Sequence, residues 1–169
     1  MKPIATVLHG TTSSGKTSLA KALRETAVTP VFHISMDAVV EMSRRSDMRS
    51  ETELNEALML HYVNLCSTLR QTATSRFDIV LDLVLRDDAR FSDCLEALSS
   101  RPTFVIGVYC PLEELKTREF HRGDRQSGLA ISQFGHPAYR RKYSLELDTS
   151  TMTPAMGAEI VRNYVRANI

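Results

Sequence analysis

The sequence lacks a long hydrophobic run. No apolar stretch approaches the roughly 18 residues that a membrane-spanning helix needs, so we expect no membrane span. The first apolar run, residues 4–8, is too short for a signal peptide and leads into a glycine-containing loop instead of a cleavage site. These observations predict a cytoplasmic protein.

Cysteine is scarce, and no two cysteines are close in the sequence. The three residues, Cys66, Cys94 and Cys110, form no C-x-x-C pair, which argues against a zinc site or a disulfide framework. We expect reduced thiols that pack in the core as small hydrophobic groups.

Neither sign of charge dominates. Lys and Arg total 21 and Asp and Glu total 20, so nothing in the composition favours nucleic acid or an anionic membrane as a partner. Internal repeats, low-complexity tracts and linkers rich in proline, glycine or serine are also lacking. The 169 residues therefore predict a single domain over 1–169, although they carry no signal for an oligomeric state.

Short apolar runs alternate with longer amphipathic segments along the chain. Apolar residues recur at helical spacing in the amphipathic segments, and the short runs have the character of buried strands. The pattern predicts an α/β fold of three layers, with a five-stranded parallel sheet covered by helices on both faces. The expected strands are 4–8, 31–34, 79–85, 103–109 and 143–147, and the expected helices are 17–25, 37–42, 51–75, 88–98, one from Pro111, and 154–167. Ligands of such sheets bind beyond the carboxyl ends of the strands.

A complete G-x-x-x-x-G-K-[ST] motif follows the first expected strand and opens a helix. Glycines let such a loop curl so that its amide groups point at phosphate oxygens. We expect Lys16 to reach the β- and γ-phosphates of ATP and the Thr17 hydroxyl to bind Mg²⁺. The predicted nucleotide-binding residues are Gly10, Thr11, Thr12, Ser13, Ser14, Gly15, Lys16, Thr17 and Ser18.

Two acids follow or interrupt neighbouring strands. Asp82 lies inside the apolar run 79–85, where an unpaired acid is costly to bury, and we predict that it holds the metal with Thr17. Asp37 follows the second strand, where it can accept the proton of an attacking hydroxyl. The alternatives are that Asp82 caps a loop and that Asp37 is the N-cap of the following helix.

Arginines cluster in residues 118–125, after the fourth strand and its helix. Arginine binds phosphate oxygens with two parallel hydrogen bonds and keeps its charge. We interpret residues 118–137 as a lid, with Arg118 on the nucleotide and Arg122 and Arg125 in catalysis. A solvated helix end is the alternative. Residues 148–150 have the position of an adenine-binding segment, or they form a turn bonded to its own backbone.

Together these segments resemble the chloramphenicol phosphotransferase-like family of P-loop kinases. The resemblance rests on HGTTSSGKTSLAKAL, SMDAVVEM, IVLDLVL, REFHRGDRQSGLA and YSLELDTS, which occur in the family's order over nearly the whole chain. It implies a shikimate-kinase-like P-loop NTPase fold and an ATP- and Mg²⁺-dependent phosphotransferase. It also implies phosphate-loop roles for Gly15, Lys16 and Thr17, the base role for Asp37 and lid roles for Arg122 and Arg125.

The leading functional hypothesis is a kinase that transfers the γ-phosphate of ATP to a hydroxyl group of a small molecule, for which chloramphenicol is one candidate. A toxin-type kinase acting on a nucleotide sugar or a protein, and a nucleotide-hydrolysing switch, are the alternatives. The sequence has no NKxD-type guanine signature. A nucleotide-binding protein without catalysis is disfavoured by Lys16, Thr17, Asp37 and Asp82.

Overall fold

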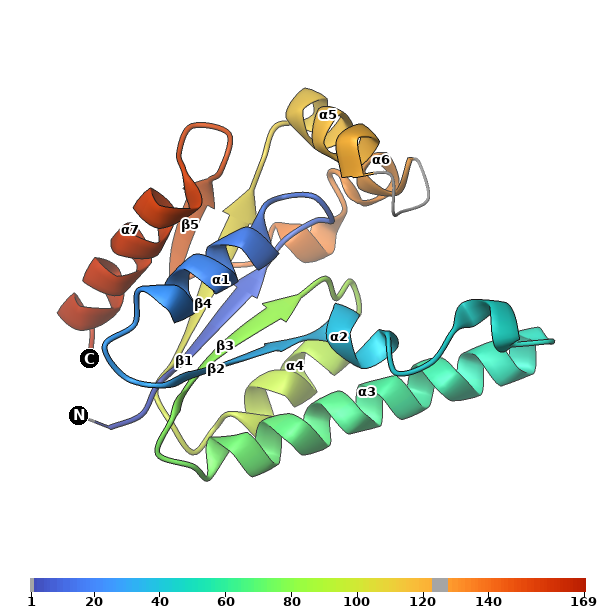
Figure 1. Cartoon of the computed structure of the whole chain (residues 1–169), viewed down its shortest axis with the longest axis horizontal. Coiled ribbons are helices and arrows are strands. Elements are labelled where there is room, and N and C mark those ends of the chain that lie inside the picture. The colour runs from blue at the N-terminus through green and yellow to red at the C-terminus, as the bar shows by residue number, and fades with distance from the viewer. Residues whose placement is uncertain (1, 123–127) are drawn as a thin grey trace.

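The computed structural model of the chain describes residues 2–122 and 128–169, except for the side chain of Arg122. In this part of the chain, five parallel strands form one sheet in the order β2-β3-β1-β4-β5 (Figure 1). The predicted five-stranded parallel sheet is therefore confirmed. The strands are β1 (Ala5–His9), β2 (Val31–Ser35), β3 (Asp78–Leu83), β4 (Thr103–Tyr109) and β5 (Leu145–Asp148).

Helices cover both faces of this sheet, as predicted. Helices α1 and α7 pack together on one face, α3 and α4 pack together on the other, and α5 and α6 lie beyond the carboxyl ends of the strands (Figure 1). The α-helices are α1 (Lys16–Glu25), α2 (Met36–Val40), α3 (Glu51–Ala73), α4 (Asp88–Ala97), α5 (Leu112–Arg122), α6 (Leu129–Gln133) and α7 (Pro154–Ala167). Two 3₁₀ turns, η1 (Arg45–Asp47) and η2 (Pro137–Tyr139), complete the elements.

The two layers of the core follow from the alternation of side chains along each strand. Val7 and Leu81 belong to the cluster under α3 and α4, whereas Leu8 and Val80 belong to the cluster under α1 and α7. Both faces of the strands are buried, which explains why their sequences are continuous apolar runs. The same alternation directs residue 82, two positions after Val80, toward the α1 side of the sheet.

Two predicted strand boundaries differ from the structure by two residues, and the others agree within one residue. Strand β3 ends at Leu83, two residues earlier than expected, because its partner β1 ends at His9. After β1 the chain enters the segment of residues 10–17, which we call the glycine loop or phosphate loop. Strand β5 begins at Leu145, two residues later than expected, where its pairing with Ile106 of β4 begins. The sequence patterns also missed α6, η1 and η2, which are too short to show a period.

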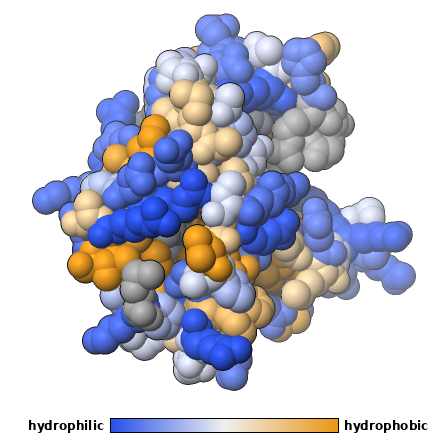
Figure 2. Space-filling view, turned by 60° about the vertical axis from the view of Figure 1, so that its left-hand side comes forward, coloured by the Kyte–Doolittle hydropathy of each residue, from blue (hydrophilic) through white to orange (hydrophobic). Residues whose placement is uncertain are grey.

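The described surface is mixed in character. Figure 2 shows hydrophilic and hydrophobic side chains interleaved on one face, in keeping with the balanced charge of the chain. Among the described residues, no helix has the length and hydrophobicity to cross a membrane. The three cysteines are buried free thiols, as predicted.

Candidate nucleotide and acceptor site

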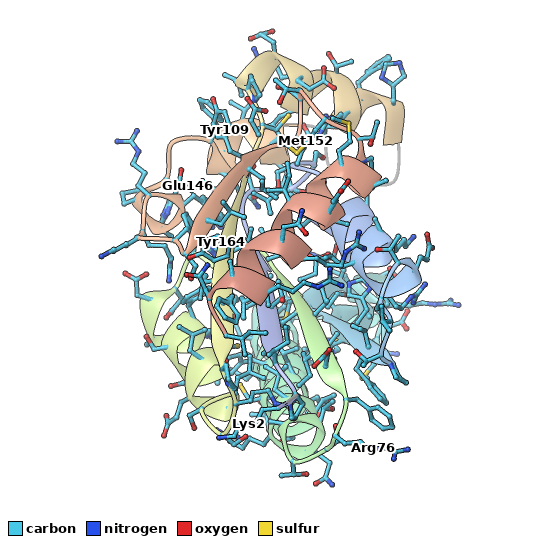
Figure 3. The ribbon with its side chains drawn as sticks, turned by 90° about the vertical axis from the view of Figure 1, so that its left-hand side faces the viewer. Lys2, Arg76, Tyr109, Glu146, Met152 and Tyr164 are labelled. Carbon is cyan, nitrogen blue, oxygen red and sulfur yellow. The ribbon has the colours of Figure 1, made fainter. Side chains whose placement is uncertain are left out.

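A cavity of about 440 Å³ lies at the carboxyl end of the sheet. The glycine loop, the start of α2, the helix α5 and the segment that leads into α7 all contribute to its walls. Met152, one of the wall residues, lies between α5 and the start of α7, whereas Lys2 and Arg76 lie at the opposite end of the molecule (Figure 3). The volume lies in the usual range for a small-molecule site.

The glycine loop needs both of its glycines. A Cβ atom at Gly10 would lie 2.2 Å from the backbone oxygen of Val108 in β4, so any side chain there would push the loop away from the sheet. Gly15 has a φ of +90° and is the N-cap of α1, a left-handed conformation that glycine adopts at little cost. Together they let the loop curl over the start of α1.

Two side chains of the loop face the cavity from buried positions. Lys16 is only 4% exposed, and its Nζ donates to the Thr11 carbonyl at 2.6 Å and contacts the Ser14 Oγ at 3.4 Å. The Oγ of Ser13 is buried and has no hydrogen-bond partner among the described residues. A buried hydroxyl without a partner is costly, and a ligand oxygen in the cavity would satisfy it.

Thr17 and Asp82, the two predicted metal ligands, are in direct contact. The Thr17 hydroxyl donates to the Oδ2 of Asp82 at 2.6 Å, and both residues line the cavity. The Nε2 of His33 lies 3.9 Å from the same oxygen, too far for a hydrogen bond, and burial lowers the pKa of His33. A neutral imidazole forms no ion pair with Asp82, so the hydrogen bond from Thr17 is the closer contact of this carboxylate oxygen.

Asp37 also lines the cavity, in the first turn of α2. The alternative interpretation, in which Asp37 is the N-cap of this helix, is wrong. The N-cap is Ser35, whose Oγ accepts from the Ala38 amide at 3.2 Å. Asp37 is exposed, and Asp82 and Val84 line the same cavity.

Arg118 lies on α5 at the other side of the cavity. Its Nη1 and Nη2 donate to the hydroxyl and the carbonyl of Thr149, both at 2.9 Å, and its Nε donates to Glu114 at 2.9 Å. Residues 148–150 form the turn considered above, since the Asp148 Oδ1 accepts from both the amide and the hydroxyl of Ser150. Thr149 within this turn lines the cavity, so the two interpretations are compatible.

Part of the predicted lid lies outside the described residues. This is true of Arg125 and of the side chain of Arg122, which ends α5. In the described part, the buried carboxylate of Glu119 accepts from the amides of Gly128 and Ala130, at 2.9 and 2.8 Å, and so ties α5 to the start of α6. Gln133, at the end of α6, accepts from the Thr12 amide in the glycine loop at 2.7 Å. No pattern in the sequence predicted the contacts of Glu119 or Gln133.

A buried histidine immediately before the loop was also missed. His9 is 0% exposed, its Nε2 donates to the Leu85 carbonyl at 2.8 Å, and its Nδ1 accepts from the Tyr143 hydroxyl at 2.9 Å. Burial is the main reason that the pKa of His9 falls to about 4, and the charges of Arg141 and Lys16 lower it further. His9 is therefore neutral, and its two hydrogen bonds link β1 to Leu85 and to Tyr143.

The structure thus gathers most, but not all, of the predicted site residues around one space. Four predicted nucleotide-binding residues lie elsewhere: Gly10 and Thr11 line a separate crevice of about 200 Å³, and Thr12 and Ser14 are buried within the loop. The predicted residues that do line the cavity are Ser13, Gly15, Lys16, Thr17, Ser18, Asp37, Asp82 and Arg118.

Comparisons with known proteins identify the family and the fold of the chain. The family described as "Chloramphenicol phosphotransferase-like protein" matches residues 4–166, which confirms the resemblance noted in the sequence. A search of curated protein sequences gives no match.

Solved structures share the fold at low sequence identity. A putative kinase from Chloroflexus aurantiacus has a TM-score of 0.75 at 18% identity, over 99% of this chain and 98% of that one. The APS kinase CysC of Mycobacterium tuberculosis, solved with AMPPNP and APS, has 0.69 at 14% identity, over 98% of each chain. Shikimate kinase of Acinetobacter baumannii has 0.68 at 15% identity, over 99% of this chain and 95% of that one. The fold is that of P-loop kinases, as predicted.

Proposed function

The chain belongs to the chloramphenicol phosphotransferase-like family, and from this premise we propose that it transfers the γ-phosphate of ATP to a hydroxyl group of a small molecule. One observation carries the proposal. A single cavity is lined by Lys16 and Thr17 of the phosphate loop and by the carboxylate of Asp37. Phosphoryl transfer needs a phosphate donor and a proton acceptor close together, and this arrangement supplies both.

The phosphate loop is the donor side. Curled backbone amides and the amino end of α1 favour phosphate groups, and Lys16 adds a positive charge in a buried setting where charge acts strongly. Arg118 and Thr149 flank the far side of the cavity, and there we assign the nucleoside part of ATP. Arg122 and Arg125 remain the candidates for cations that stabilise the transferring group.

Mg²⁺ fits the residues that are present. Thr17 and Asp82 offer a hydroxyl and a carboxylate oxygen, the hard ligands that Mg²⁺ prefers, while the hydroxyl hydrogen points to Asp82. Among the described residues no group of three or more His, Cys, Asp or Glu side chains forms a complete metal cage. Such a sparse set suits Mg²⁺, which usually binds through one or two protein groups and the phosphates of the substrate. When bound, the ion would neutralise charge on those phosphates.

Asp37 defines the acceptor side. Its carboxylate would orient the acceptor hydroxyl and take its proton as transfer completes. The position at the start of α2, beside the phosphate loop, supports a small acceptor that enters between α2 and α5. The family name makes chloramphenicol one candidate for that acceptor, and a hydroxyl group is the feature that any acceptor must supply.

The test is turnover of ATP with Mg²⁺ in the presence of chloramphenicol, nucleotide sugars and a panel of hydroxylated metabolites, followed by phosphorus NMR of the products. A new phosphate ester on a small acceptor is the expected result. Hydrolysis of ATP that no acceptor stimulates would favour a nucleotide-hydrolysing switch instead. A phosphorylated nucleotide sugar as the sole product would favour the toxin-type kinase.

A further inference from the structure

Ser13 has an unusual backbone conformation for a residue with a side chain. Its φ of +59° is the only positive φ of a non-glycine residue in the described part of the chain. This left-handed conformation is unfavourable for an L-amino acid and persists only when the surrounding structure enforces it. Ser13 lines the cavity, and its buried hydroxyl has no hydrogen-bond partner among the described residues.

Two long-range hydrogen bonds bracket Ser13. On one side, the Oε1 of Gln133 accepts from the amide of Thr12 at 2.7 Å, although the two residues are 121 positions apart. On the other side, the hydroxyl of Thr149 donates to the carbonyl of Ser14, also at 2.7 Å and across 135 positions. The residue on each side of Ser13 is therefore held by a distant segment, Thr12 through its amide and Ser14 through its carbonyl.

Each of these side chains is itself held firmly. Gln133 is only 5% exposed, and the Thr12 amide, which needs an acceptor, fixes which end of its side-chain amide faces the loop. The helix α6 that carries Gln133 is tied to α5 by Glu119. Thr149 is gripped by both Nη atoms of Arg118, one residue before Glu119 on the same helix. Both side chains that hold the loop, Gln133 and Thr149, are therefore linked to α5.

We propose that Gln133 and Thr149 are positioning residues that hold Ser13 in its left-handed conformation and so preorganise the phosphate loop for the nucleotide. This inference rests on the nucleotide binding of the proposed function. It adds two residues outside the loop motif to the group that determines nucleotide affinity.

The cleaner test replaces Gln133, because Thr149 also contacts Arg118. Gln133→Met keeps the length of the side chain and removes the acceptor, and Gln71→Met makes the same change at an exposed site on α3. Binding of Mg²⁺-AMPPNP is measured by titration calorimetry well below the melting temperature, so no acceptor is needed. We expect about tenfold weaker binding for Gln133→Met, since a buried amide loses its partner, and no change for Gln71→Met.

The backgrounds Ser13→Ala and Ser13→Gly separate positioning from simple packing. Alanine removes the hydroxyl but keeps the backbone strain, whereas glycine removes both, because it adopts positive φ freely. Gln133→Met should therefore weaken binding about tenfold in the alanine background and less than about twofold in the glycine background. Equal losses in the two backgrounds would overturn the proposal, as would unchanged binding by Gln133→Met itself.

Thr149→Val is a second, independent test of the proposed positioning role. Valine has the shape of threonine, so packing against Gly15 is kept, and only the hydrogen bonds of the hydroxyl are lost. We expect weaker AMPPNP binding here as well, with Thr52→Val on the exposed side of α3 as the unaffected control. Wild-type protein that binds AMPPNP but phosphorylates no acceptor would contradict the proposed kinase and leave the positioning result standing. Wild-type protein that binds no nucleotide would overturn both.

Discussion

The hydroxyl of Thr17 donates a 2.6 Å hydrogen bond to the Oδ2 of Asp82, which joins the phosphate loop to the third strand of the sheet. The contact follows from the alternation along β3. Val80 packs under α1, and Asp82, two residues later on the same face, emerges at the first turn of that helix. An acid inside an apolar strand thus has its partner in the loop motif itself.

Replacement of Asp82 tests this relationship. Asp82→Asn keeps a hydrogen-bond acceptor for Thr17 but removes the charge that would hold Mg²⁺ through direct or water-mediated contact. We expect at least about tenfold more Mg²⁺ for half-maximal activity, and kcat lower by about a hundredfold. Mg²⁺ titrations of initial rate measure both values. Asp78→Asn, at the opposite end of the same strand, should leave the Mg²⁺ requirement unchanged.

Asp37 is the residue on which the chemistry of the proposed reaction depends most directly. Asp37→Asn removes the proton acceptor and leaves the phosphate loop intact, so ATP affinity should stay within about twofold while kcat falls by about 10²–10⁴. Single-turnover transfer and AMPPNP binding separate the two effects. Asp47→Asn, an exposed carboxylate in η1, is the matched control. Normal transfer by the Asp37 variant would show that another group takes the proton.

The sequence predicted the strands, helices and loop that form this site, but not the single hydrogen bonds that hold the loop in place. Short apolar runs and helical patterns located the strands and long helices, and the loop motif located Lys16 and Thr17, because these signals are local. Gln133 and Glu119 gave no signal, since each acts through one contact with a backbone amide that a fold must first bring near. At the start of α2, both Ser35 and Asp37 are favoured capping residues, and only the path of the chain out of β2 selects Ser35.

Arg101 is a further residue that no pattern identified, and it provides a prediction about stability. Arg101 is 6% exposed, and its guanidinium donates to the carbonyls of Thr72, Ala73, Ser75 and Phe77, where α3 ends and the chain turns into β3. Thr72 and Ala73 belong to the last turn of α3, whose carbonyls have no partner within the helix. Arginine suits the position because its planar group donates in several directions at once.

Arg101→Met should remove the buried donor that these four carbonyl groups share. We expect the free energy of unfolding to fall by about 2–4 kcal/mol, measured by urea denaturation at constant pH. Nucleotide binding at low temperature should persist, because the site is at the other end of the sheet. Arg166→Met, an exposed arginine near the end of α7, should change stability by no more than about 0.5 kcal/mol. A loss as small as that of the control would mean that water replaces the guanidinium without cost.

His9 makes the stability of the fold depend on pH. Its pKa is about 4 in the folded protein and about 6.5 when the chain is unfolded, so between these values the unfolded state binds more protons. Stability is therefore retained at and above neutral pH and is lost as the pH falls from about 6.5 toward 4. For one group with this shift, the loss approaches about 3 kcal/mol.

His9→Gln isolates this contribution. Glutamine keeps an N–H donor for the Leu85 carbonyl and does not titrate, whereas His33, whose pKa is also lowered, is present in both proteins and cancels in the comparison. Between pH 7 and 4.5, wild type should lose about 2–3 kcal/mol more stability than the variant in urea denaturation. Parallel losses would mean that the folded protein accommodates a protonated His9. That could happen only if water reached His9 and replaced its hydrogen bonds to Leu85 and Tyr143. The residue before the phosphate loop, which begins at Gly10, would then no longer be held in place.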